Sequence, residues 1–122
     1  MSVDRQKLYE NAEDFFALDG NAVMKLSRHA AKEVCSRAAT KELVVVKLEG
    51  GIWNDRKFEA RLDAIWDGLD PPADPDSAHR NNLLAVTFIQ SADPAYNAFI
   101  LTSVSVKGYS PRQPQGVLVN KP

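Results

Sequence analysis

The sequence predicts an α+β protein in which two N-terminal helices pack on an antiparallel sheet of four to five strands. Apolar residues recur at helical spacing through the first 38 residues, whereas short runs rich in β-branched residues begin after Lys41. The chain has 122 residues, of which 44% are hydrophobic and 25% are charged, as in ordinary globular proteins. This length fits one domain and is short for two, so we expect residues 1–122 to form a single domain.

Two helices are expected in the N-terminal third. Residues 4–18 carry apolar side chains at helical spacing, and Gly20 follows as a plausible stop. The second helix is expected over residues 22–38, with a wide apolar surface made by Val23, Met24, Leu26, Ala30, Ala31, Val34 and Cys35. A face this wide can be covered by the sheet or, in part, by a second copy, so a homodimer through residues 23–38 is left open.

The sheet is expected to begin with a strand over residues 43–48, which Gly50 and Gly51 would end. Residues 83–89 are apolar on both faces, which favours a central strand. Residues 98–106 predict a further strand, and residues 117–119 a short edge strand.

Residues 57–66 fit two patterns. Apolar and charged residues alternate strictly up to Asp63, as in a half-buried strand, and Ile65 alone interrupts the alternation. Phe58, Leu62, Ile65 and Trp66 also fit the spacing of a helix. The strand is preferred because Gly50 and Gly51 suit a chain reversal just before it, and the α+β class holds in either case.

A long polar loop is expected over residues 69–82, and a proline-containing tail over residues 108–122. Loops of this length without secondary structure are usually functional or disordered. Prolines restrict the backbone of the loop, which lowers the entropy that it would lose on binding a partner.

Charge is unevenly distributed although the net charge is only −1. Residues 1–20 carry five acidic and two basic side chains, and residues 21–41 carry one and five. These opposite signs suggest contacts between the two helices, but surface ion pairs are weak, so solvated faces are the preferred interpretation. Residues 54–76 carry seven acidic and three basic side chains.

The acidic segment is the candidate binding site. It contains Asp67, Asp70, Asp74 and Asp76, with Trp53 and Trp66 nearby in the sequence. A stiff acidic loop beside aromatic anchors suits docking of a protein with a basic surface. The competing interpretation is that both tryptophans belong to the core, as is common in small domains.

No catalytic motif, metal site or cofactor-binding motif is found, so no catalytic residue is assigned and no cofactor is expected. His29 and His79 are far apart in the sequence, and a single cysteine, Cys35, excludes a multi-cysteine zinc site. An acid–base set of Glu49, Asp63 or Asp67 with His79 is conceivable, but no spacing brings these residues together.

Nucleic acid and membrane partners are not favoured. Lys25, Arg28, Lys32 and Arg37 form a basic helix face, but the acidic segments would repel phosphates. No apolar run approaches the ~20 residues that cross a membrane, and no secretory signal is recognisable. A lone cysteine suits a reducing compartment, so a cytoplasmic protein is expected.

In build, the chain resembles the small cytoplasmic immunity proteins of bacterial toxin–immunity systems, through the segment Asp67–Asp76 with Trp53 and Trp66. The resemblance implies a non-enzymatic protein that occludes a cognate toxin, often a nuclease with a basic cleft. The alternative is a small-ligand-binding or enzymatic α+β domain. A deep apolar cavity with Asp63, Asp67 or His79 facing inward would support that alternative.

Overall fold

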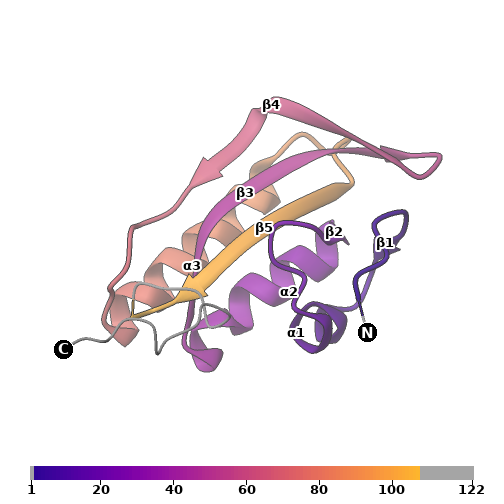
Figure 1. Ribbon diagram of the computed structural model, residues 1–122. Coiled ribbons are helices and arrows are strands. Elements are labelled where there is room, and N and C mark those ends of the chain that lie inside the picture. The colour runs from indigo at the N-terminus through magenta and orange to yellow at the C-terminus, as the bar shows by residue number, and fades with distance from the viewer. Residues whose placement is uncertain (1, 108–122) are drawn as a thin grey trace.

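The computed structural model describes residues 2–107 and contains three α-helices, one 3₁₀ helix and five strands (Figure 1). In chain order they are β1 (Leu8–Tyr9), α1 (Ala12–Leu18), β2 (Lys25–Ser27), α2 (Arg28–Ala38), η1 (Ala39–Lys41), β3 (Leu43–Asn54), β4 (Lys57–Asp67), α3 (Pro75–Ser91) and β5 (Ala98–Ser105). The expected tail and the strand at residues 117–119 lie outside the described residues.

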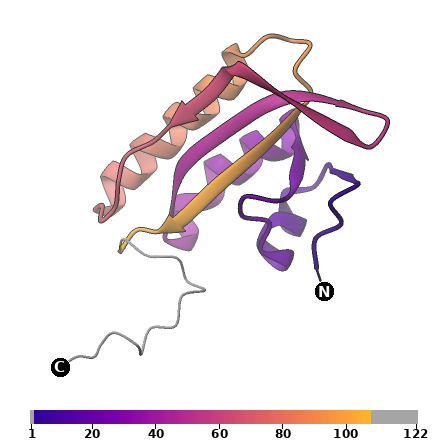
Figure 2. The same cartoon turned by 45° about the horizontal axis from the view of Figure 1, so that its top comes forward.

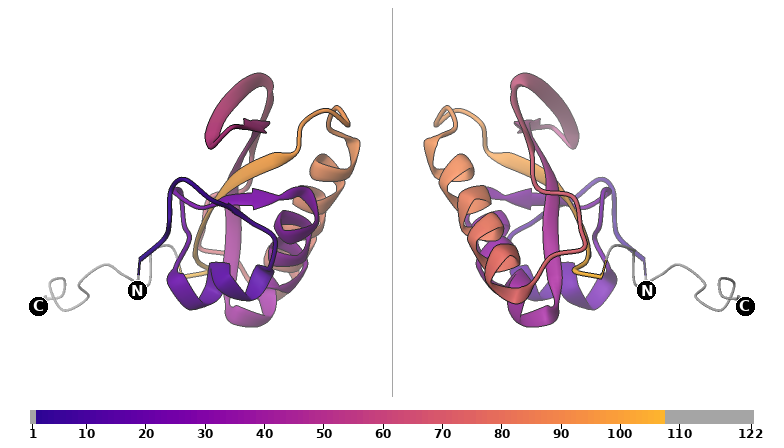
Figure 3. Two further views of the ribbon diagram at one scale, coloured as in Figure 1. Left: turned by 90° about the vertical axis from the view of Figure 1, so that its right-hand side faces the viewer. Right: turned by 90° about the vertical axis from the view of Figure 1, so that its left-hand side faces the viewer.

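The strands form one sheet in the order β1-β2-β5-β3-β4. Only β1 and β2 run parallel, and the other neighbours are antiparallel. Helices α2 and α3 lie side by side against one face of the sheet, and the long β3–β4 hairpin curls beyond them (Figures 2 and 3). The predicted α+β class is therefore confirmed, with α3 rather than α1 as the second helix that covers the sheet.

The core lies between the sheet and these helices. The face of α2 that packs on the sheet is made of small side chains, so the helix approaches the strands closely. Phe99 and Leu101 of β5 and Leu48 of β3 fill the space beneath. The apolar residues of α2 at positions 30, 31, 34, 35 and 38 are all buried, so the chain itself covers the face for which a homodimer was considered.

The N-terminal helices are shorter than predicted. The first begins only at Ala12, because the side chain of Asn11 accepts the N–H of Glu13 (2.8 Å) and caps the helix there. The second begins at Arg28 with Ser27 as its N-cap, and residues 25–27 form a strand. The predicted helices extended past Asn11 and Ser27, because the spacing of apolar residues does not by itself show where a helix begins.

The strand over residues 57–66 is confirmed as β4, but the reversal before it was misplaced. Gly50 and Gly51 lie inside β3, and Asp55 and Arg56 make the turn with positive φ angles of 55° and 64°. Gly51 is needed for close strand contact, because a Cβ there would collide with the carbonyl oxygen of Glu59.

The strand predicted at residues 83–89 is wrong, since these residues belong to α3. The expected loop over residues 69–82 is accordingly shorter, because residues 75–82 already form the first turns of this helix. Asp74 caps α3 and Pro75 occupies its first turn, which is a helix-start signature that the sequence analysis missed. Residues 83–89 are apolar on more than one side of the helix. One side packs on the sheet, while Leu83 and Leu84 stay exposed.

One end of β3 lacks a strand partner on the β4 side. Pairing of β3 with β4 begins at Lys47 and Asp67, so residues 43–45 present backbone groups on that side with no strand to receive them. Buried backbone groups without partners cost free energy, so something else must satisfy them.

Two adjacent asparagines of α3 supply the missing hydrogen bonds. Asn82 accepts the N–H of Val45 (2.9 Å) and donates to the carbonyl of Leu43 (3.0 Å). Asn81 donates to the carbonyl of Val45 (2.8 Å) and accepts the N–H of Leu69 (3.0 Å). Both asparagines are buried, and together they fix α3, β3 and the start of the loop after β4.

Basic residues of α2 make contacts within the chain. Arg28 donates to the carbonyls of Ile89, Asp93 and Tyr96 and so closes the C-terminal end of α3. Arg37 pairs with Glu13 of α1 at 2.8 Å, as the opposite charges of the two segments suggested. These arginines are therefore engaged structurally and do not form a free basic face.

We predict that Asn82→Ala lowers the free energy of unfolding by about 2–4 kcal/mol, because two backbone groups of β3 lose their partner. Urea denaturation measures this change. Leu83→Ala is the matched control, because its side chain is 43% exposed, and it should cost less than about 1 kcal/mol. Equal effects of the two substitutions would contradict the assigned role of Asn82.

Candidate functional site: a groove between β4 and α3

A shallow groove of about 410 Å³ lies where the end of β4 passes α3. Trp66, Leu69 and Leu84 give it an apolar lining. The Trp66 ring packs at 6.5 Å, centroid to centroid, from Phe88 of α3, so its position is fixed by the core. Leu84 is 61% exposed, which is unusual for a leucine on a helix that packs on a sheet.

The chain segment that forms one side of this groove is acidic. Residues 62–79 contain five aspartates and no lysine or arginine. Asp67 lines the groove directly, and Asp70 lies exposed in the loop that follows. Arg80 also lines it, with its guanidinium 3.3 Å from the hydroxyl of Ser77. The predicted acidic segment thus meets an apolar surface.

Asp74 and Asp76 stabilise the start of α3. The carboxylate of Asp74 accepts the backbone N–H of Ser77 (2.7 Å) and its hydroxyl (3.2 Å). These hydrogen bonds, that of the backbone first, lower the pKa of Asp74, so it stays charged. Asp76 lies in the first turn of the helix, where a negative charge suits the helix dipole.

The loop that leaves β4 can follow its path only with glycine at position 68. A Cβ there would collide with the carbonyl oxygen of Val45 and with the side-chain oxygen of Asn81. The N–H of Gly68 instead donates to the carbonyl of Val46 (2.9 Å). This close approach sets the distance between the loop and α3, and so the width of the groove.

Trp53 lies elsewhere. It pairs with Phe58 near the tip of the hairpin, and its backbone is held by Asn97. Trp66 lies eight positions after Phe58 along β4, a span of up to ~26 Å of strand. The structure therefore places Trp66 and Asp67 in the groove and Asp70 in the loop that follows, but leaves Trp53 outside the groove.

The groove also includes residues that the sequence analysis did not select. Leu69, Arg80 and Leu84 line it, and Leu84 had been assigned to a strand. Ser77, Asn81, Leu84 and Phe88 recur at spacings of three and four, which would have indicated a helix face had the cap at Asp74 been recognised.

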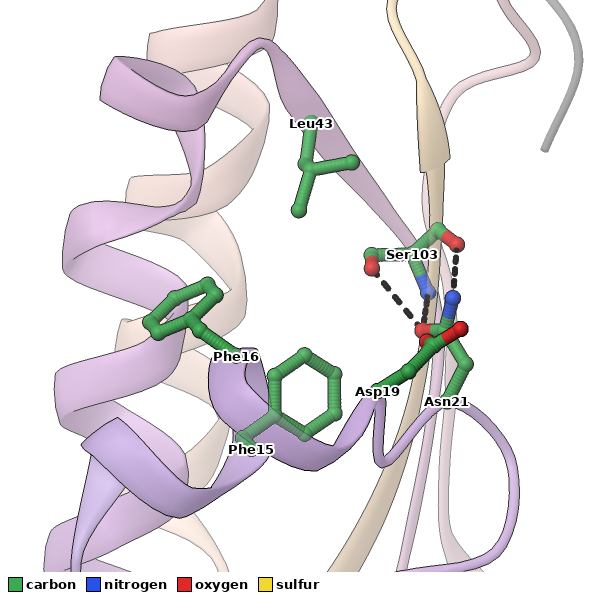
Figure 4. Close-up of a pocket in the computed structure, with 6 residues that line it drawn as sticks. All are labelled: Phe15, Phe16, Asp19, Asn21, Leu43 and Ser103. Carbon is green, nitrogen blue, oxygen red and sulfur yellow. Dashed lines mark hydrogen bonds between the residues drawn. The ribbon is translucent and has the colours of Figure 1, made fainter. Parts of the chain in front are cut away.

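The small-ligand alternative predicted a deep apolar cavity with Asp63, Asp67 or His79 facing inward, whereas all three side chains are exposed. A separate pocket of about 270 Å³ lies near α1 (Figure 4). Two of its three polar residues, Asn21 and Ser103, bind each other through three hydrogen bonds of 2.8 Å, and the third is Asp19. The bonded groups of Asn21 and Ser103 complete the edge of β5 and are not free to recognise a ligand.

Other chemical features are limited among residues 2–107. No group of three or more His, Cys, Asp or Glu side chains could hold a metal ion in this part of the chain. Burial raises the pKa of Cys35 to about 12, so its thiol is protonated at neutral pH and is a poor nucleophile. No helix in the described part of the chain is long and apolar enough to span a membrane.

The groove is open and combines an apolar lining with the charged side chains of Asp67 and Arg80. The family model described as the colicin E5 immunity protein matches residues 24–104, which cover every element from β2 to most of β5. The chain belongs to this family of immunity proteins. Membership confirms the predicted class, a non-enzymatic protein that neutralises a toxin by binding it.

Three relatives agree with this assignment. The immunity protein CdiI of Burkholderia pseudomallei is 48% identical over 109 residues, covering 89% of this chain and all of the relative. The colicin-E5 immunity protein of Escherichia coli is 38% identical over 80 residues, covering 65% of this chain and 96% of the relative. The colicin-E5 immunity protein in ColE9, also from Escherichia coli, matches to the same extent.

We predict that the cap at Asp74 makes the stability of the protein pH-dependent. Because the folded pKa is lowered, the charged carboxylate stabilises the protein above the pKa of the unfolded chain, and this contribution is lost as the pH falls through the folded pKa. Thermal unfolding between about pH 5 and pH 3 should show a smaller loss for Asp74→Asn, which keeps an acceptor but cannot titrate.

At neutral pH, Asp74→Ala should lower the melting temperature more than Asp74→Asn, because alanine offers no acceptor to the N–H of Ser77. If the melting temperatures of the wild-type protein and of Asp74→Asn depended on pH in the same way, the charge of the Asp74 carboxylate would not stabilise the fold.

Proposed function

We propose that the chain neutralises a toxin of the colicin E5 type by placing the groove between β4 and α3 on a cationic surface of that toxin. The relatives are named as immunity proteins to colicin E5 or as CdiI, and the family model spans the elements that build the groove. The observation that carries the proposal is an apolar floor, made by Trp66, Leu69 and Leu84, that adjoins an acidic rim, made by Asp67 of the groove and Asp70 of the loop after it.

The apolar floor supplies contact area. Trp66 is held by Phe88, so it loses little side-chain freedom on binding. Exposed Leu84 gains most from being covered, since burying a leucine side chain is worth roughly 1.5–3 kcal/mol. Tryptophan is enriched among the residues that contribute most to binding at protein interfaces, so Trp66 is the aromatic anchor in this proposal.

The rim supplies charge. Asp67 and Asp70 are exposed and are not needed as helix caps, so they are the residues we assign to contact with the toxin. Asp74 and Asp76 add to the negative field while serving α3. Such a field speeds encounter with a basic partner and is screened by salt. Trp53 belongs to the same proposal only if the toxin extends to the hairpin.

The partner in this proposal is a protein and not a nucleic acid. The acidic rim would repel phosphates, and Arg28 and Arg37 are already engaged within the chain. A cytoplasmic site of action is supported by Cys35, which is a buried free thiol, as expected in a reducing compartment.

We predict that Asp67→Lys with Asp70→Lys slows association with the cognate toxin domain about tenfold or more at low salt, while the melting temperature changes little. Stopped-flow association measures the rate, and the salt dependence of that rate should decrease as well. Glu10→Lys with Asp14→Lys is the matched control, because it changes the net charge equally at the start of α1.

The proposal would be overturned by a double variant that keeps the wild-type association rate and salt dependence. It would also be overturned if the control pair slowed association as much, since net charge and not the groove would then be responsible.

A further inference from the structure

The β4 strand is an edge of the sheet, and no other described strand pairs with its outer side. Its pairing with β3 passes from Glu49–Ile65 to Gly51–Ala60, so residues 61–64 stand opposite Gly50 alone. The strand bends away from β3 at this point. Leu62, in the bend, is 89% exposed, more than any other large hydrophobic residue described. An edge strand presents unpaired backbone N–H and C=O groups with which another chain can pair.

The sequence of β4 is complementary to itself when it is reversed about Leu62. Residues at equal distances on either side of Leu62 form the pairs Arg61 with Asp63, Ala60 with Ala64, Phe58 with Trp66 and Lys57 with Asp67. Two pairs thus join opposite charges and one joins two aromatic residues. Glu59 with Ile65 is the single pair that is not complementary.

We propose that two copies of the chain associate through β4, antiparallel to each other, around a two-fold axis at Leu62. In such an isologous contact every pair occurs twice, which doubles the effect of each complementary charge. Aromatic pairs and opposite charges across antiparallel strands are both stabilising. The exposed Leu62 side chains of the two copies then cover each other.

The charged residues of β4 favour pairing with a second copy of the chain in the register centred on Leu62. Moving the axis to Arg61 places Arg61 against Arg61 and Glu59 against Asp63, and moving it to Asp63 places Asp63 against Asp63 and Glu59 against Asp67. A parallel arrangement in register sets every charge against itself. Like charges directly opposite each other are destabilising, so these alternatives are disfavoured.

Both charged residues of the inner pair, Arg61 and Asp63, have partners within the single chain. The carboxylate of Asp63 accepts the hydroxyl of Tyr96 at 2.8 and 3.0 Å, which holds it near the bend. Arg61 lies 3.3 Å from Glu59 on the same strand. The outer pair, Lys57 with Asp67, is therefore the cleaner one to test, and both of its residues are exposed.

Sedimentation equilibrium of the full chain, without toxin, tests the proposal from micromolar to millimolar concentration. The wild-type protein should dimerise, and Lys57→Asp or Asp67→Lys should each weaken the dimer about tenfold or more, because like charges then meet twice. Mixing the two variants should restore association, since in the mixed dimer each aspartate faces a lysine. Asp70→Lys, with the same charge change as Asp67→Lys but outside β4, should leave the dimer intact.

A wild-type chain that stays monomeric at millimolar concentration would overturn the proposal, and so would variants that do not recover on mixing. Leu62→Ser is the control for misfolding. The Leu62 side chain is 89% exposed, so this substitution should leave the fold intact, and it should still weaken the dimer. The assay contains no toxin, so its failure would leave the proposed function untouched.

Discussion

The side-chain amides of Asn81 and Asn82 hold the architecture together. They take the place of a strand where β3 extends past the end of β4, and they satisfy backbone groups that would otherwise be buried without partners. The same pair receives the N–H of Leu69, so the loop after β4 is tied to α3. The groove exists because the end of β4, its loop and α3 are fixed to one another at this point.

Asparagine has the same role at two other places in the sheet. Asn21 binds both backbone groups of Ser103 where β5 extends beyond the short β2. Asn97 binds both backbone groups of Trp53 near the hairpin. An asparagine side chain carries the donor and acceptor of a peptide group, so it can replace one residue of a missing strand. A small sheet with strands of unequal length can in this way be completed without more chain.

The sequence predicted the parts of the fold in which local pattern and final environment agree. Alternation identified β4 correctly, and the continuous acidic segment remained together because its members are neighbours in the chain. Helix α3 was missed because a run of apolar residues fits a central strand as well as a helix, and only the cap at Asp74 decides between them. Trp53 could not be placed, since its distance from Trp66 depends on a turn at Asp55 and Arg56 that contains no glycine.

Hydrogen–deuterium exchange of the chain with and without its cognate toxin domain tests the central claim most directly, because it locates the covered surface without any substitution. The account predicts that bound toxin slows exchange of the amides at residues 66–70 and in the α3 turns around Leu84, which border the groove. Slowed exchange confined to the exposed side of α2, with the groove unchanged, would show that the toxin is bound by another surface.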